Sequence, residues 1–271
     1  MAKRNMKSQT DTRQRTALSD IDKERLHMIG PAMSFAAAEA YKLLRTNLVF
    51  SFSGEESCRT VGVTSSVRDE GKSLTAINLA YTLAETQKRV LLIGCDMRLP
   101  TLSKRLDMRA TPGLSNLLVG MSSVNEAIQM YTTRMEDDVE VRVEILVSGD
   151  IPPNPSELLS SERMEKLLGM LREHYDYIIL DLPPVTAVSD AVIACKLVDG
   201  MVIVVRSDHA ERTALSETIR QLRQVNGRIL GFVFNGAGGS GTGYYKGKKN
   251  YYYKKKNYYR NYYYQNTYNQ E

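Results

Sequence analysis

The chain has few cysteines and no long apolar run. Its 271 residues include Cys58, Cys95 and Cys195, an odd number at wide spacing, each beside apolar residues. This argues against a disulfide or zinc framework and is typical of small buried side chains in a reducing compartment. No apolar run approaches the ~20 residues that span a bilayer, and the start of the sequence lacks the apolar stretch of a secretory signal. We therefore expect a cytoplasmic chain without a membrane span.

The net charge of +5 is concentrated in the last part of the sequence. Residues 244–271 hold seven Lys and Arg and one Glu, so this segment carries +6 and the residues before it carry −1 in total. The composition, 42% hydrophobic and 25% charged, is that of a globular protein. The positive charge therefore indicates no nucleic-acid-binding face on the folded part, and we expect no nucleic-acid partner.

Short apolar runs alternate with helical patterns along the middle of the chain. The runs cover residues 60–64, 90–95, 143–147, 177–180, 201–205 and 229–234, and helical patterns lie at 34–50, 71–85, 155–172, 189–197 and 210–225. This alternation predicts an α/β fold with a mostly parallel central sheet flanked by helices. In such sheets, ligands bind at the carboxyl ends of the strands.

The composition divides the chain into three parts. Residues 1–33 are polar and weakly periodic, so we expect a mobile leader, and residues 34–235 form the folded domain. Residues 236–271 begin with a glycine-rich hinge and lack the aliphatic side chains that build a core, so we expect a disordered tail. Eleven of the sixteen tyrosines lie in this tail: Tyr244, Tyr245, Tyr251, Tyr252, Tyr253, Tyr258, Tyr259, Tyr262, Tyr263, Tyr264 and Tyr268.

The segment TVGVTSSVRDEGKSLTAINLA has the pattern of a phosphate-binding loop between a strand and a helix. Backbone N–H groups at the helix start would bind phosphate oxygens, Lys72 would reach the β and γ phosphates, and the Ser73 hydroxyl would bind Mg²⁺. The match is imperfect because Ser66 stands in place of the first glycine. An ordinary turn before a helix is the alternative interpretation of Gly71-Lys72-Ser73.

Two carboxylates follow buried strands further along. Asp96 ends VLLIGCD, with Arg98 beside it, and Asp181 ends YDYIILD. Asp181 stands where a Walker B carboxylate supports the metal, and Asp96 stands where a metal or an attacking hydroxyl would come. Each could instead be a helix cap or a turn residue. The three elements in this order favour nucleotide binding.

The chain resembles the bacterial tyrosine kinases of capsule and exopolysaccharide biosynthesis, in their form as a separate cytoplasmic chain. The motifs that carry the resemblance are EAYKLLRTN at 39–47, EGKS at 70–73, CDMRLP at 95–100, GLSNLL at 113–118, NPSELLSSERM at 154–164 and DLPPV at 181–185. The resemblance implies a P-loop fold that transfers the γ-phosphate of ATP to tyrosine. NPSELL and the terminal tyrosines distinguish the chain from the related partitioning ATPases.

The resemblance also implies roles for particular residues, with ATP and Mg²⁺ as cofactors. Lys72, Asp96 and Asp181 would be catalytic, with Asp96 orienting or deprotonating the tyrosine hydroxyl. Ser73, Asp96 and Asp181 would hold the metal. The nucleotide would be bound by Glu70, Gly71, Lys72, Ser73, Leu74 and Asn235, the last beside adenine, although a turn residue is an equally good interpretation of Asn235.

Family resemblance implies partners as well. A Glu39-x-x-Lys42-x-x-Arg45 pattern would pack neighbouring copies into a ring-like homo-oligomer, although the same side chains could form a solvated charge stripe. The tail tyrosines would be the phosphoacceptors. The remaining implied partners are a membrane polysaccharide co-polymerase, which would recruit and activate the kinase at the inner face of the membrane, a phosphotyrosine phosphatase and other cytosolic substrates.

The sequence departs from the family pattern at two places. Arg68-Asp69 replaces the usual Pro-Gly, so we expect strain in the loop and negative charge near the phosphates. Gly94 replaces a carboxylate, and we expect Gly94→Asp to raise activity by restoring it. Three functions stay open: a tyrosine autokinase with weakened activity, a partitioning-type ATPase, and a non-catalytic regulator. The Lys- and Tyr-rich tail could also contact nucleic acid or an anionic membrane.

Overall fold

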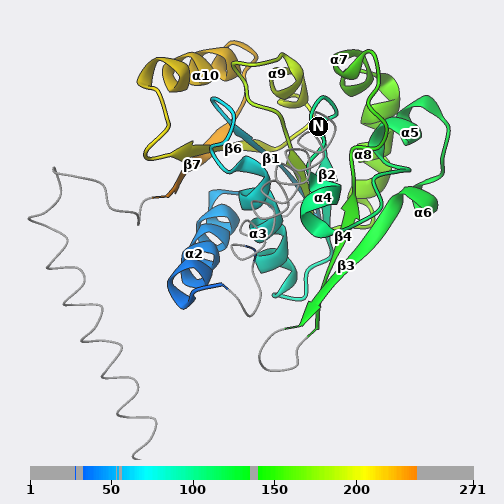
Figure 1. Cartoon of the computed structure of the whole chain (residues 1–271), viewed down its shortest axis with the longest axis horizontal. Helices are drawn as coiled ribbons and strands as arrows, with labels where there is room; N and C mark the ends of the chain where they lie inside the picture. The colour runs from blue at the N-terminus through cyan, green and yellow to red at the C-terminus, as the bar shows by residue number, and fades with distance from the viewer. Residues whose placement is uncertain (1–27, 29–32, 53, 55–56, 135–139, 237–271) are drawn as a thin grey trace, which may run out of the picture. The chain divides into compact units, whose positions relative to one another are not determined.

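The computed structural model describes residues 28, 33–52, 54, 57–134 and 140–236. Within them, a seven-stranded sheet has the order β3-β4-β2-β5-β1-β6-β7 (Figure 1). The strands are β1 Arg59–Ser65, β2 Val90–Gly94, β3 Ile128–Arg134, β4 Glu140–Leu146, β5 Tyr177–Asp181, β6 Gly200–Arg206 and β7 Ile229–Asn235. All neighbouring strands are parallel except β3 and β4. The predicted α/β fold with a mostly parallel sheet is confirmed.

Helices cover both faces of the sheet (Figure 1). The described helices are α2 Phe35–Ser51, α3 Lys72–Ala84, α4 Leu102–Leu106, α5 Leu114–Val119, α6 Val124–Ala127, α7 Pro155–Leu159, α8 Glu162–Arg172, α9 Asp190–Ala194 and α10 Arg212–Gln224. One apolar cluster joins the sheet to α2, α3 and α4, and the other joins it to α5 and α7–α10. Along β2, alternate residues enter the two clusters, because successive side chains of a strand point to opposite faces.

The short helices α4, α5 and α6 have no counterpart among the predicted helical patterns, and two further details differ from the sequence-based expectations. The strand β3 had no counterpart among the predicted apolar runs, because IQMYTTR is polar at most positions and pairs only at the antiparallel edge of the sheet. The helix expected at 155–172 is two helices, since Ser160 ends α7 and Ser161 caps α8 by accepting a hydrogen bond from the Met164 N–H at 3.3 Å. Neither difference moves the carboxyl edge of the parallel strands.

The predicted leader and tail lie almost entirely outside the described residues. Met28 is described, and its side chain is buried in the cluster that includes Ile77 and Leu92. The tyrosines from position 244 onward are outside the described residues. In the part of the chain that the structure describes, no helix is both long and apolar enough to span a bilayer.

The parallel pairing brings the carboxyl ends of five strands, β2, β5, β1, β6 and β7, to one edge of the sheet. Gly94 of β2 is paired with Asp181 of β5, Asp181 with Val63 of β1, and Arg206 of β6 with Asn235 of β7. The loops that leave these strands therefore meet at one edge of the sheet, where a doubly wound fold places its ligands.

Candidate active site

The loop from β1 to α3 has a conformation that depends on Gly71. This residue has φ = 93°, in the left-handed region that favours glycine, and a Cβ there would overlap Asn235 Nδ2. Asp69 also has a positive φ, 61°, where a non-glycine residue is strained. The strain expected from the Arg68-Asp69 replacement is therefore present in the backbone at Asp69.

Glu70 supports the loop from inside. Its side chain is fully buried, and its carboxylate accepts hydrogen bonds from the backbone N–H groups of Ser66 at 2.8 Å and Val67 at 3.0 Å. The Arg206 N–H donates to the other carboxylate oxygen at 3.4 Å, and the Asn235 side chain donates to the Glu70 carbonyl at 3.0 Å. Glu70 thus joins the loop to the ends of β6 and β7.

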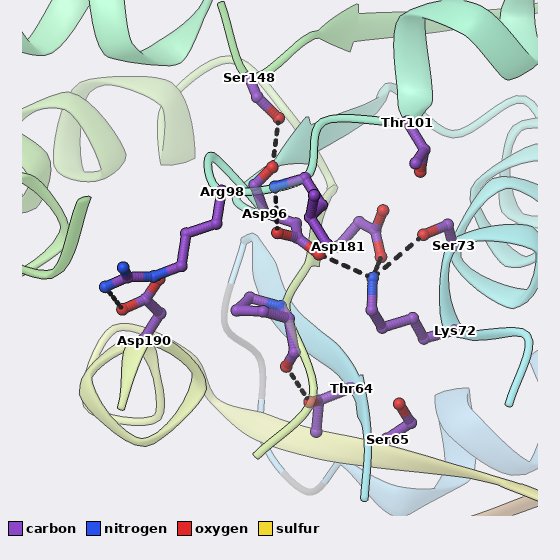
Figure 2. A network of polar contacts seen from close by, with 12 residues as sticks. Thr64, Ser65, Lys72, Ser73, Asp96, Arg98, Thr101, Ser148, Asp181 and Asp190 are labelled. Carbon is purple, nitrogen blue, oxygen red and sulfur yellow. Dashed lines mark hydrogen bonds and ion pairs between the residues drawn. The ribbon is translucent and has the colours of Figure 1, made fainter. Parts of the chain in front are cut away.

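Lys72 lies between two carboxylates at the start of α3. Its Nζ is 3.1 Å from Asp96 Oδ2, 3.9 Å from Asp181 Oδ1 and 3.4 Å from Ser73 Oγ (Figure 2). Burial raises the pKa of Asp181, and the Lys72 ammonium acts against this rise. The Lys72 side chain is only 13% exposed, although Arg68 and Asp69 in the same loop are exposed.

A cavity of about 410 Å³ adjoins this cluster. Its wall contains most of the residues predicted to bind nucleotide: Gly71, Lys72, Ser73, Leu74 and Asn235, together with Asp96. Glu70 is buried behind the wall, and Asp181 is connected to the site by its ion pair with Lys72. Four arginines that the motif search did not assign to the nucleotide also line the cavity, namely Arg68, Arg98, Arg105 and Arg206.

Arg98 connects the cavity to the NPSELL motif. Its guanidinium donates to both carboxylate oxygens of the buried Asp190, at 2.9 and 3.1 Å, and to Ser156 Oγ at 2.9 Å. Ser156 in turn donates to Asp190 at 2.6 Å. Figure 2 shows Arg98 turned away from Lys72 toward Asp190. Sequence reasoning missed Asp190, although its place at the start of a helix after DLPPV was an available signal.

Gly94 is closely packed against Ser148, which follows β4. A Cβ at this position would lie 2.8 Å from Ser148 Oγ and 3.2 Å from Ser148 N. Ser148 donates a hydrogen bond to the Asp96 carbonyl at 3.2 Å (Figure 2). The Ser148 hydroxyl thus fills the space beside residue 94. Restoring an aspartate at 94 therefore requires Ser148 to move.

The residues predicted to form an oligomer interface lie on α2 in two different environments. Glu39 and Lys42 pair with each other at 3.0 Å, and both side chains are 43% exposed. Arg45 instead turns toward α3, where it donates to the Thr82 carbonyl at 2.6 Å and lies 3.4 Å from Glu85. Glu39 and Lys42 are accessible to another copy, whereas Arg45 also attaches α2 to its own domain.

Known proteins are similar to this chain in sequence and in fold. The family described as an AAA domain matches residues 67–230. The tyrosine-protein kinase YwqD of Bacillus subtilis (strain 168) is 37% identical over 217 residues, which cover 79% of this chain and 88% of that protein. The chain belongs to the bacterial tyrosine-kinase family.

Solved structures of this family agree with the assignment. The kinase domain of the Escherichia coli tyrosine kinase ETK superposes with a TM-score of 0.69 at 32% identity, covering 77% of this chain and 79% of that one. The chimerical protein CapA2B2 superposes with a TM-score of 0.65 at 31% identity, covering 72% and 82%. The chain therefore shares the fold of the ETK kinase domain over most of its length.

Proposed function

We propose that this chain is an ATP- and Mg²⁺-dependent protein-tyrosine kinase that phosphorylates the tyrosines of its own C-terminal segment. The observation that carries the proposal is the position of Lys72 between Asp96 and Asp181 on the wall of a cavity. A cation, two carboxylates and a helix start at one strand edge are the parts that phosphoryl transfer uses.

The donor atoms at this site suit magnesium. Asp181 Oδ1 is buried and accepts no hydrogen bond within the described part of the chain, and the Ser73 hydroxyl and the Asp96 carboxylate lie beside the same lysine. Mg²⁺ prefers oxygen ligands and uses one or two carboxylates together with phosphate oxygens. Ser73, Asp96 and Asp181 would hold the ion, which supplies charge neutralisation for the phosphates when bound.

Side chains of the protein would carry out the transfer of the phosphoryl group and of the tyrosine proton. The acceptor tyrosine oxygen would form a bond to the γ-phosphorus as the bond from that phosphorus to the β,γ-bridging oxygen breaks, and ADP would leave with the electron pair. Asp96 Oδ would take the phenolic proton, since this carboxylate lines the cavity whereas Asp181 is buried behind Lys72. Lys72 would hold the phosphates in position. Positioning of the reacting groups and neutralisation of their charge supply most of the rate enhancement in phosphoryl transfer.

The tail charge gives the modification a physical effect. Each phosphate adds about −1.5 to −2 charge at pH 7, so three or four would reverse the +6 of residues 244–271. Phosphorylated tails gathered on a ring of copies would repel one another and loosen the ring. In this proposal the kinase acts at the inner face of the cell membrane, where a polysaccharide co-polymerase activates it and a phosphatase removes the phosphates from its tail. The cycle of phosphorylation would control capsule or exopolysaccharide polymerisation and export.

A catalytically weakened regulator of the same assembly is the second candidate. The positive φ of Asp69 and the packing of Ser148 beside Gly94 favour it, because both alter the family's phosphate and metal surroundings. In this case the ring and partner contacts would persist without phosphotyrosine.

A mixing experiment tests the proposal. Lys72→Met with an intact tail would be incubated with Mg-ATP and a protein that has an unchanged active site but ends after Gly243, with and without a co-polymerase peptide. The tail residues from 244 to 271 can extend roughly 90 Å at ~3.3 Å per residue, so reach allows transfer between copies. We expect phosphotyrosine on the Lys72→Met protein.

Two controls make the result decisive. Asp96→Asn with an intact tail serves as a second acceptor, because Lys72→Met leaves the buried Asp181 without its cation. The full-length protein alone shows whether the chain is active. Phosphotyrosine only in the full-length protein would mean transfer within one copy. Its absence everywhere, with retained oligomers, would favour the regulator, and ADP formation without phosphotyrosine would favour an ATPase.

A further inference from the structure

Arg105 lies on the cavity wall that the β2–α4 segment forms. It is near the end of α4, half-buried, and lines the same cavity as Lys72, Ser73 and Asp96. Its Nε donates to Thr101 Oγ1 at 3.4 Å, and Thr101 also lines the cavity. Figure 2 shows the Thr101 hydroxyl directed toward the part of the site that holds Ser73. The hydrogen bond therefore holds the Arg105 side chain against another residue of the same cavity wall.

Two cations from different elements line the cavity. Lys72 stands at the start of α3, 3.9 Å from Asp181, and Arg105 stands on α4 beside the segment that carries Asp96. An anion that enters the cavity thus meets positive charge from α3 and from α4.

We propose that Arg105 is a further catalytic residue, which binds oxygens of the transferred γ-phosphoryl group and stabilises their charge as the phosphorus moves from ADP to tyrosine. This inference rests on the proposed kinase function. A guanidinium presents a planar fork that matches two phosphate oxygens, which a lysine ammonium cannot do. An arginine that neutralises the transferring group contributes a factor of about 10³ to 10⁵ where it has been measured in other phosphoryl-transfer enzymes.

The site also favours a role in the transition state over simple nucleotide binding. Lys72, Ser73 and Gly71 belong to the loop and helix start that hold phosphates, whereas Arg105 comes from the segment that carries Asp96, the proposed proton acceptor. A group on this side meets the phosphoryl as it approaches the tyrosine. Removing it should therefore lower the rate far more than the affinity for ADP.

The test compares Arg105→Ala and Arg105→Lys with Lys104→Ala as the matched control. Lys104 neighbours Arg105 on α4, is exposed and does not line the cavity. Full-length variants would be assayed for phosphorylation of a Lys72→Met tail, and for binding of Mg-ADP with and without aluminium fluoride, which mimics the transferring phosphoryl. We expect Arg105→Ala to lower kcat about 100-fold or more, while the Mg-ADP affinity changes less than about 3-fold.

The binding readout separates this inference from the proposed function. Arg105→Ala should lose the gain in affinity that aluminium fluoride gives the unchanged protein, Arg105→Lys should keep part of it, and Lys104→Ala should keep all of it. If the unchanged protein forms no phosphotyrosine yet shows this pattern, the kinase proposal fails and the phosphoryl contact stands. An unchanged fluoride effect in Arg105→Ala would overturn the inference, as would an equal loss of Mg-ADP affinity. Should Arg105→Ala fail to fold, Arg105→Lys and Arg105→Gln decide by the same measurements.

Discussion

The buried carboxylate of Glu70 gives the sharpest prediction, because its removal leaves donors without partners inside the domain. In the Glu70→Ala variant, the N–H groups of Ser66, Val67 and Arg206 lose acceptors that lie at 2.8, 3.0 and 3.4 Å. A hydrogen bond to a charged group contributes about 1.5–3 kcal/mol, and part of this is offset because a charge no longer needs to be buried. We expect the free energy of unfolding to fall by about 2–4 kcal/mol.

Glu70→Gln provides the intermediate case. An amide has one acceptor oxygen, which can keep the bonds from Ser66 and Val67, while its NH₂ group then faces the Arg206 N–H. We expect a loss of about 1–2 kcal/mol, between the unchanged protein and Glu70→Ala. Because the same bonds shape the loop, the affinity for Mg-ATP should fall in the same order.

The assay is urea denaturation followed by far-UV circular dichroism, a suitable probe because the chain contains no tryptophan. Glu162→Ala is the matched control, since this glutamate pairs with Lys166 on α8 and its side chain is 76% exposed. Its removal should change stability by no more than about 0.5 kcal/mol. A Glu70→Ala protein that unfolds at the same urea concentration as the unchanged protein would refute the argument that Glu70 holds the loop.

Two further predictions concern the carboxyl ends of β2 and β5. Gly94→Asp should lower the free energy of unfolding, because its Cβ would lie 2.8 Å from Ser148 Oγ. Adding Ser148→Ala should recover part of the loss in urea denaturation, and equal stability of Gly94→Asp and the unchanged protein would contradict this. Burial raises the pKa of Asp181 above 3.8, so the unfolded chain loses this proton first and stability falls as pH rises from 3.8 through the folded pKa. Asp181→Asn should lack this decline, and identical pH profiles for the two proteins would count against it.

The strand pattern and the order of the site motifs could be predicted from the sequence because they are local. A buried parallel strand appears as an apolar run, and the residues that follow it must lie at the carboxyl edge of the sheet. For this reason Lys72, Asp96 and Asp181 were expected together before the fold was known. The strand Ile128–Arg134 could not be predicted in this way, because an edge strand of mixed polarity has no such apolar run.

The environment of each site residue could not be predicted, because it depends on contacts between distant segments. Ser148 contacts the Asp96 carbonyl across 52 residues, and Asp190 binds Arg98 across 92. No local pattern states which side chain fills the space beside Gly94. The sequence suggests a missing metal ligand there, and the fold adds that a side chain at this position requires Ser148 to move.

Asn235 makes the site sensitive to mechanical load. It ends β7, and its side-chain amide holds the Glu70 carbonyl at 3.0 Å, while the tyrosine-bearing part of the chain follows it. A pull applied along the chain from residue 237 would load this hydrogen bond together with the one that the Ser207 N–H donates to the Asn235 carbonyl at 3.0 Å, so it would reach the phosphate loop and the end of β6. Tension on the substrate segment would thus be transmitted directly to the loop that positions the nucleotide, so that a stretched tail and a relaxed tail would present different sites to ATP.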